Sequence, residues 1–220
     1  MRRAGGRQEK LGTEMKKATE ITCLFLDIGG VLLTDGWNVD ARKRAAADFN
    51  LDFAEMEDRH QLLFSIYEEG KLSLEEYLCR TVFFENRPFT QDQFREFMFA
   101  QSVADSKMIR LTRTLKSKYK LKTVVVSNEA RELNTFRIRK FNLKAVVDVF
   151  VSSCFVGIRK PDPEIFRLAL DLSQVPVEQI IYLENTAMHV EIAASLGIQG
   201  IWHTDHGSTR AKLEALGLGQ

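Results

Sequence analysis

The chain has 220 residues, and 45% of them are hydrophobic, which is enough apolar material for a packed core. Its 31 Lys and Arg residues nearly balance 30 Asp and Glu residues, so the formal net charge is +1. This balance argues against a broad basic surface for nucleic acid or membrane, and no apolar run reaches the length of a membrane span. We therefore expect neither nucleic acid nor membrane as a partner, and we leave the oligomeric state open.

The N-terminal segment and the cysteines bear on the compartment. Residues 1–19 are polar and basic and lack the apolar stretch of a signal peptide, so we expect a disordered lead-in. Cys23, Cys79 and Cys154 are widely spaced, and no pair has zinc-ligand spacing. This usage is typical of a reduced protein, and we expect a cytoplasmic location.

The first clear element is an apolar run over residues 21–26, which ends in a turn containing Gly29 and Gly30. Its length and composition predict a buried parallel strand. From residue 38 to 101 apolar residues instead recur at helical spacing, as in Leu62, Leu63 and Ile66. This stretch shows no strand pattern, and we interpret residues 37–104 as an inserted helical cap.

Helix starts within this insertion are marked by local signals. Ser73 with Glu76 and Thr90 with Gln93 have the spacing of capping boxes, in which each N-cap hydroxyl and the side chain three residues later satisfy backbone N–H groups. The phenylalanine-rich stretch from Phe83 to Phe99 is expected to form the core of this cap.

After the insertion, helix and strand patterns alternate. This order is typical of a parallel sheet with helices on both faces. We predict an α/β fold, a Rossmann-like doubly wound parallel sheet, whose core covers residues 20–36 and 105–220. The helices are expected over 107–119, 131–141, 163–172, 187–196 and 209–216, and the strands over 123–126, 146–151, 179–183 and 199–202.

Polar residues follow four of the predicted strands, and a doubly wound sheet gathers such residues into one cleft at its carboxyl edge. An aspartate in such a cleft can act as a nucleophile and form an aspartyl-phosphate. A hydroxyl and backbone N–H groups can bind phosphate oxygens, and a lysine can balance the charge on the nucleophile and the transferring group. The set therefore suits phosphoryl transfer; its members are Asp27, Ser127, Asn128, Lys160, Glu184 and Asn185.

These residues lie in four motifs that together resemble the haloacid dehalogenase-like hydrolase superfamily. The segments, in chain order, are Asp27-Ile-Gly29-Gly30-Val-Leu, Val126-Ser127-Asn128, Lys160-Pro-Asp-Pro-Glu-Ile-Phe166 and Tyr182-Leu-Glu184-Asn185. The resemblance covers roughly residues 20–215. Within the superfamily, the first motif and the cap placement look like the branch that contains sugar-phosphate phosphatases and domains fused to acyl-CoA dehydrogenases.

The resemblance implies a magnesium-dependent phosphatase of a small phosphorylated metabolite. Asp27 would be the nucleophile, Ser127 and the Asn128 backbone would hold phosphate oxygens beside the turn of Gly29 and Gly30, and Lys160 would stabilise charge. The same resemblance places Mg²⁺ between Asp27, the Gly29 carbonyl and Asn185. Glu184 is a candidate supporting ligand, directly or through water.

Three positions depart from the family pattern. Gly29 stands where most members have a second aspartate that acts as general acid and base, and the loss of such a group typically costs about 10²–10⁴-fold in rate. Asn185 replaces the main magnesium-binding aspartate, and His189 stands where a metal-supporting Asp or Asn is common. These changes predict weak metal binding, slow turnover or no catalysis.

Two alternatives therefore stay open. One is a pseudophosphatase that binds a phosphorylated ligand or a protein partner without turnover. The other is a metal-free dehalogenase, in which the aspartate attacks carbon, although Gly29 replaces the aromatic residue usual there. Lesser candidates are Trp37 and Asn38, which could shape the pocket, and His203 with His206, which we interpret as loop residues.

Overall fold

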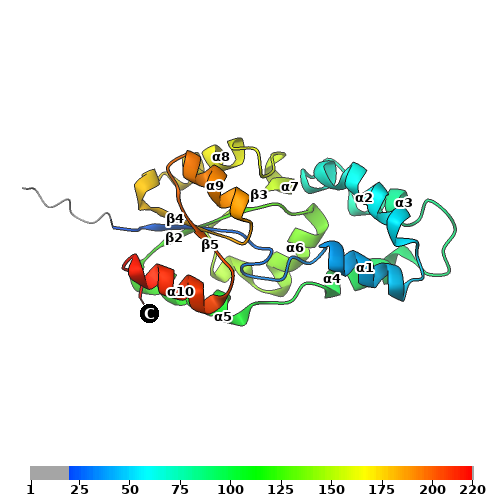
Figure 1. Cartoon of the computed structure of the whole chain (residues 1–220), viewed down its shortest axis with the longest axis horizontal. Coiled ribbons are helices and arrows are strands. Elements are labelled where there is room, and N and C mark those ends of the chain that lie inside the picture. Colours follow the sequence, from blue (N-terminus) through cyan, green and yellow to red (C-terminus); the bar gives the residue numbers. More distant parts are fainter. Residues whose placement is uncertain (1–19, 220) are drawn as a thin grey trace, which may run out of the picture.

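The computed structural model describes residues 20–219, so the predicted lead-in over residues 1–19 lies outside the described residues. Five parallel strands form one sheet in the order β3-β2-β1-β4-β5. Helices cover both faces of this sheet, and a separate group of helices lies at one end of the molecule (Figure 1). The strands are β1 (Cys23–Leu26), β2 (Lys122–Ser127), β3 (Val149–Ser152), β4 (Ile180–Glu184) and β5 (Gln199–Trp202).

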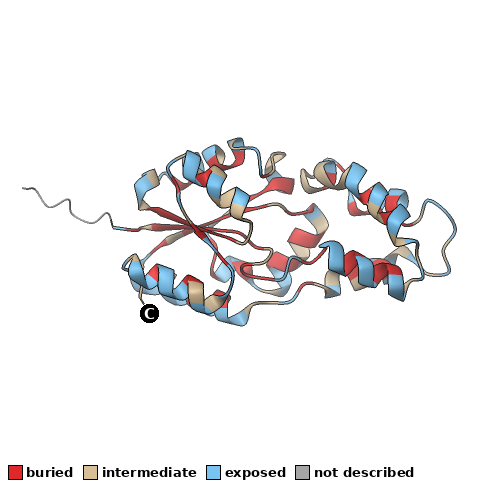
Figure 2. Cartoon of the chain, in the orientation of Figure 1, coloured by how far each residue is buried: buried red, intermediate tan, exposed pale blue. Residues whose placement is uncertain are grey.

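The sheet is apolar on both faces, as a parallel sheet with helices on both sides requires. In β1, Leu24 and Leu26 pack into one cluster with residues of α5 (Ser106–Tyr119) and α10 (His206–Ala215). Cys23 and Phe25 point to the opposite cluster, which includes residues of α8 (Glu164–Ser173) and α9 (Ala187–Ser195). Burial is accordingly concentrated in the strands and in the helix faces against them (Figure 2).

The observed order confirms the predicted doubly wound fold. The remaining core elements are α6 (Arg131–Lys140), the short α7 (Ser153–Val156) and two 3₁₀ turns, η1 (Leu143–Ala145) and η2 (Val177–Gln179). The strand predicted over 146–151 starts only at Val149, because the preceding residues turn out of η1. Among the residues described, no helix has the length and apolarity needed to cross a membrane.

The inserted helical cap consists of α1 (Val39–Asp48), α2 (Phe53–Glu68), α3 (Leu74–Thr81) and α4 (Gln91–Ala100). It lies beyond the carboxyl edge of the sheet (Figure 1). Both predicted capping boxes are present, at Ser73 and at Thr90. The phenylalanine-rich stretch forms much of the core of the cap, with Phe94 at its centre.

The chain enters and leaves the cap at one place. Leu33 and Ala104 form an isolated antiparallel bridge, and the Thr34 amide donates a hydrogen bond of 2.9 Å to the Val103 carbonyl. The Thr34 hydroxyl adds a bond of 2.7 Å to the carbonyl of Gln101. Two connections far apart in sequence are therefore joined directly above the carboxyl end of β1.

Candidate active site

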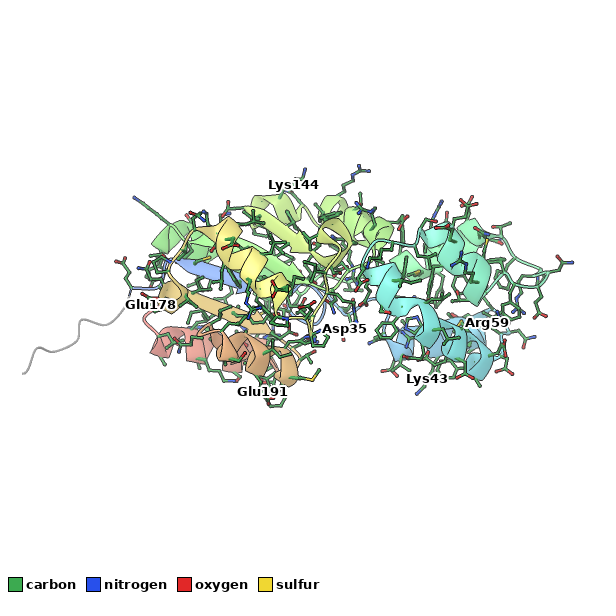
Figure 3. All side chains as sticks on the ribbon, turned by 90° about the horizontal axis from the view of Figure 1, so that it is seen from above. Asp35, Lys43, Arg59, Lys144, Glu178 and Glu191 are labelled. Carbon is green, nitrogen blue, oxygen red and sulfur yellow. The ribbon has the colours of Figure 1, made fainter. Side chains whose placement is uncertain are left out.

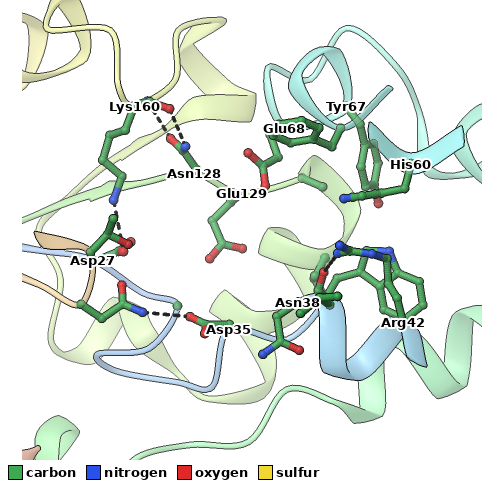
Figure 4. Close-up of a pocket in the computed structure, with 18 of the residues that line it drawn as sticks. Asp27, Asp35, Asn38, Arg42, His60, Tyr67, Glu68, Asn128, Glu129 and Lys160 are labelled. Carbon is green, nitrogen blue, oxygen red and sulfur yellow. Dashed lines mark hydrogen bonds and ion pairs between the residues drawn. The ribbon is translucent and has the colours of Figure 1, made fainter. Parts of the chain in front are cut away.

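Asp27 lies at the carboxyl end of β1, in the middle of the sheet. Its backbone amide donates a hydrogen bond of 2.9 Å to the Leu183 carbonyl of β4, which extends the strand pairing to Asp27. Its Oδ1 accepts the Ile28 amide at 2.9 Å, and its Oδ2 lies 3.1 Å from Nζ of Lys160. The carboxylate is 7% exposed and faces the cavity below the cap (Figure 4).

Lys160 is buried and held from both ends. Its Nζ lies 2.6 Å from Oε2 of Glu184 and 3.1 Å from the Tyr182 hydroxyl. Its backbone is fixed by Asn128, whose amide nitrogen donates to the Lys160 carbonyl and whose amide oxygen accepts the Lys160 N–H, both at 2.8 Å. The Asn128 side chain therefore positions the lysine, while its backbone remains beside the cavity.

Glu184 is fully buried, and the Lys160 ammonium contacts both its carboxylate and that of Asp27. Its Oε1 accepts the Thr186 amide at 2.8 Å, and its Oε2 accepts hydrogen bonds from Lys160 and from the Tyr182 hydroxyl. Both oxygens already have donors. These contacts favour a role in holding Lys160 over the predicted role as a magnesium ligand.

The electrostatics of this cluster follow from burial and charge. Burial raises the pKa of Asp27 to about 8, with Glu184 acting in the same direction and the Lys160 ammonium opposing both. Burial also tends to raise the pKa of Glu184, but nearby His189 and the hydrogen-bonded ammonium of Lys160 hold it below its ordinary value. Burial tends to lower the pKa of Lys160, and the two carboxylates more than reverse this, so the lysine is charged.

Ser127 ends β2 beside Asp27. It is 1% exposed, and its hydroxyl accepts the Ile28 amide at 3.4 Å and lies the same distance from a Glu129 carboxylate oxygen. The structure thus brings Asp27, Ser127 and Asn185, from the ends of different strands, to one edge of the sheet. Lys160 reaches the same edge from the loop between α7 and α8.

The glycine turn after Asp27 leaves space for the other loops. Gly30 has φ +69°, and a Cβ atom there would lie only 2.0 Å from Nδ2 of Asn185. Any larger residue at this position would displace Asn185. A Cβ atom on Gly29 would instead lie 3.4 Å from Oδ1 of Asp35, a residue the motif analysis did not single out.

The donor types at this edge match the chemistry of magnesium, which takes oxygen ligands and usually one or two carboxylates with water. Asp27 offers a carboxylate, Gly29 a carbonyl and Asn185 an amide oxygen. Nowhere in residues 20–219 do three His, Cys, Asp or Glu side chains converge as a metal site. A cation here would therefore depend on neutral oxygens as well as on Asp27.

A cavity of about 430 Å³ opens from Asp27 toward the cap. Core residues, among them Asn128 and Glu129, line one wall (Figure 4). The predicted contribution of Trp37 and Asn38 is confirmed, since both line the cavity. The cap supplies further lining residues that the sequence did not reveal, namely Arg42, His60, Gln61, Phe64, Tyr67 and Glu68.

The arginines of the cavity are already paired. Arg42 contacts Glu57 through two hydrogen bonds of 2.6 and 2.8 Å. Arg137, which is 2% exposed, holds both oxygens of Glu129 at 2.7 and 2.9 Å. Arg137 also contacts Ser102 and the Thr34 carbonyl, so it joins the site to both cap connections.

The histidine candidates have different surroundings, and His206, predicted in a loop, is the first residue of α10. His203 is buried, and its Nδ1 lies 2.7 Å from the Thr209 hydroxyl, so it packs in the core instead of lying in an exposed loop as predicted. His189 lines the cavity, with Nδ1 3.5 Å from Oε2 of Glu184. It therefore belongs to the cluster around Glu184.

This fold and this arrangement of strand ends define a hydrolase class. The family model of haloacid dehalogenase-like hydrolases matches residues 21–197, and the chain belongs to this family. A phosphorylated carbohydrates phosphatase of Thermotoga maritima is 26% identical over 196 residues, which cover 87% of this chain and 90% of that protein. Mouse acyl-CoA dehydrogenase family member 10 is 44% identical over 70 residues, 31% of this chain and 6% of that protein.

Solved structures show the same fold. A HAD family enzyme from Bacteroides thetaiotaomicron superposes with a TM-score of 0.71 at 18% identity, covering 83% of this chain and 93% of that one. A HAD-like family hydrolase from Porphyromonas gingivalis gives a TM-score of 0.72 at 19% identity, covering 92% of this chain and 100% of that one. The fold prediction and the family resemblance are thereby confirmed.

Proposed function

We propose that the protein is a magnesium-dependent phosphatase that acts on a small phosphorylated metabolite through an aspartyl-phosphate on Asp27. The observation that carries the proposal is the contact of 3.1 Å between Oδ2 of Asp27 and the buried ammonium of Lys160, at the mouth of the cavity. A carboxylate in this setting keeps an oxygen directed at a substrate while the lysine balances the charge that builds up on the phosphoryl group.

Each residue of the site has a separate role in the proposed reaction. Asp27 attacks phosphorus and the bond to the leaving oxygen breaks; water then cleaves the aspartyl-phosphate and releases phosphate. Ser127 and the backbone amides after it hold phosphate oxygens, Lys160 stabilises their charge, and Glu184 with Asn128 keeps Lys160 in place. Bound Mg²⁺, held by Asp27, the Gly29 carbonyl and Asn185, would supply further neutralisation of the phosphoryl charge.

The cavity supports a substrate whose non-phosphate part is polar and uncharged. Arg42 and Arg137 are committed to Glu57 and Glu129, so neither is free to bind a second phosphate. The relative from Thermotoga maritima is a phosphatase of phosphorylated carbohydrates, and the related enzyme from Bacteroides thetaiotaomicron has been solved with magnesium and inorganic phosphate. Sugar monophosphates are therefore the first substrates to test.

The decisive measurement is phosphate release from p-nitrophenyl phosphate and a panel of sugar phosphates, with Mg²⁺ or with EDTA. We expect release that requires Mg²⁺ and falls to background in Asp27→Asn. Asp40→Asn changes an exposed carboxylate outside the cavity and should match the wild type. Phosphate release that persists in EDTA would contradict the metal assignment.

A second candidate is a pseudophosphatase that binds a phosphorylated ligand without turnover. The neutral amide of Asn185, where most relatives of this family would carry an aspartate, favours it. Its signature would be a folded protein that releases no phosphate from any substrate yet is stabilised against heat by a sugar phosphate. Loss of that stabilisation in Lys160→Met would place the ligand in the same cavity.

A further inference from the structure

Asp35 carries a carboxylate that lines the cavity and has no role in the proposed mechanism. It lies in the loop between β1 and α1, at the junction of core and cap, whereas Lys43 and Arg59 lie out on the cap (Figure 3). We propose that Asp35 is the proton-transferring residue of the reaction and replaces the carboxylate that position 29 lacks. This inference rests on the proposed phosphatase function.

The position of the Asp35 carboxylate is the first support. A Cβ atom on Gly29 would lie 3.4 Å from Oδ1 of Asp35 and 3.5 Å from its Cα. A Cβ atom on Gly30 would meet the same oxygen at 2.8 Å. The loop therefore folds back over the glycine turn, and Asp35 lies in ordinary van der Waals contact with the position that a Cβ atom on Gly29 would take. A carboxylate from a residue eight positions along the chain thus lies beside the glycine turn that follows Asp27.

The backbone around Asp35 is fixed, which is the second support. The amide and the hydroxyl of the preceding residue, Thr34, donate hydrogen bonds to the carbonyls of Val103 and Gln101. The Thr34 carbonyl accepts a hydrogen bond of 3.2 Å from Nη2 of Arg137. The following residue, Gly36, has φ +72°, and a Cβ atom there would overlap Nη2 of Arg137 at 1.7 Å. Proton transfer needs a positioned group, and these contacts fix the backbone on both sides of Asp35.

The third support is the bonding of the other acidic groups in the cavity. Glu129 is paired with Arg137, Glu68 with Arg159, and Asp27 with Lys160. The Asp35 carboxylate instead accepts a hydrogen bond of 3.2 Å from the neutral amide of Asn185, and no ion pair is formed by it within the described residues (Figure 4). It is also exposed to the cavity. Among the acidic side chains that line this cavity, Asp35 is therefore the one without a cationic partner in the described part of the chain.

The proposed reaction has two steps, formation of the aspartyl-phosphate and its hydrolysis. An Asp27 oxygen forms a bond to phosphorus, the bond from phosphorus to the leaving oxygen breaks, and the Asp35 carboxyl gives its proton to that oxygen. Water then attacks the phosphorus of the aspartyl-phosphate and passes a proton to the Asp35 carboxylate. The bond between phosphorus and Asp27 breaks, its electron pair returns to Asp27, and phosphate leaves with both aspartates restored.

The test compares leaving groups in Asp35→Asn. An alkoxide of a sugar needs a proton as it leaves, whereas p-nitrophenolate does not, so only the sugar phosphate should depend strongly on Asp35. We expect kcat/KM for the sugar phosphate to fall about 10²–10⁴-fold, the range for loss of a general acid, and for p-nitrophenyl phosphate less than about tenfold. Asp40→Asn is the matched control, and the thermal unfolding midpoint of each variant reports folding.

A rescue variant sharpens the result. Adding Gly29→Asp to Asp35→Asn returns a carboxylate to position 29, and we expect recovery with the sugar phosphate in particular. Equal losses for both substrates, together with weaker Mg²⁺ binding measured by calorimetry, would overturn the assignment and make Asp35 a metal ligand. Unchanged kinetics in Asp35→Asn would overturn it while leaving the phosphatase intact. A wild-type protein that releases no phosphate would overturn both proposals together.

Discussion

At the scale of single residues, the buried ion pair between Arg137 and Glu129 links the cavity to both connections of the cap. Both side chains are 2% exposed, and the arginine also contacts Ser102 and the Thr34 carbonyl. Burial raises the pKa of Glu129, and the charge of Arg137 opposes this shift. Removal of one partner leaves the other charge buried and unpaired, which is far more costly than the loss of the pair as a unit.

We therefore predict that Arg137→Met lowers the free energy of unfolding by about 3–5 kcal/mol, as is typical when a buried pair is broken. The double variant Arg137→Met with Glu129→Gln should recover part of this loss, because it leaves no unpaired charge. Urea unfolding of the wild type, both single variants and the double variant gives the coupling energy. Strictly additive effects would show that the two side chains do not depend on each other.

At the scale of elements, the side chains of N-cap residues help to determine where the cap helices begin. The Ser73 hydroxyl accepts the Glu76 amide at 3.2 Å, and the Glu76 carboxylate accepts the Ser73 amide at 2.9 Å. Each bond satisfies a backbone group that the first turn of a helix would otherwise leave free. Removing the hydroxyl removes one of these bonds and weakens the start of α3.

Ser73→Ala should accordingly lower the free energy of unfolding by about 1 kcal/mol, the usual cost of losing an N-cap side chain. Ser117 lies exposed in the last turn of α5 and has no capping role, so Ser117→Ala is the matched control and should not destabilise. Urea midpoints of the two variants make the comparison. Similar midpoints for both would mean that the capping bond adds nothing in the folded protein.

The elements that could be predicted from the sequence are those whose signals are local. Apolar periodicity and capping residues fixed α5, α9 and β5 to within a residue or two. The four-residue α7 (Ser153–Val156) is shorter than the period that reveals a helix, so no pattern could indicate it. The start of β3 was misplaced because Val146 is apolar and buried without being in a strand.

Some residues of the candidate site could be predicted from local sequence signals, and others could not. Residues directly after strands could be predicted, since parallel strands bring their carboxyl ends to one edge. Asp35 could not, because its place depends on how the loop from Thr34 to Gly36 folds against the second cap connection. The contribution of His60 and Glu68 depends on how the whole cap sits above the sheet, which no local pattern encodes.

At the scale of the whole molecule, stability should depend on pH through a histidine buried in the cap. His60 Nδ1 lies 2.8 Å from the Tyr77 hydroxyl, which also accepts the Trp37 indole N–H at 2.9 Å. The pKa of His60 is lowered from 6.5 to about 4, mainly by burial and also by the charge of nearby Arg42, while Glu57 opposes both. The folded protein therefore keeps this ring neutral where the unfolded chain would already be protonated.

The contribution of His60 to stability is complete above about pH 6.5 and is lost as the pH falls toward 4, because the unfolded chain binds the proton first. Between pH 7 and pH 4 the wild type should lose roughly 3 kcal/mol more than His60→Gln. Urea unfolding of both proteins across this range measures the difference. Curves that run parallel would show that His60 titrates alike in the folded and unfolded chain.

The antiparallel contact between Leu33 and Ala104 has a further consequence for how the molecule can change over evolution. Because the two ends of the cap lie side by side, the insertion is attached to the core as a closed loop. The entropy of closing a loop grows only slowly with its length, so exchange for a longer or shorter insertion at this joint would cost the core little. Because the cap supplies one wall of the cavity, a new specificity could be grafted there while the strand ends that carry Asp27 and Asn185 stay unchanged.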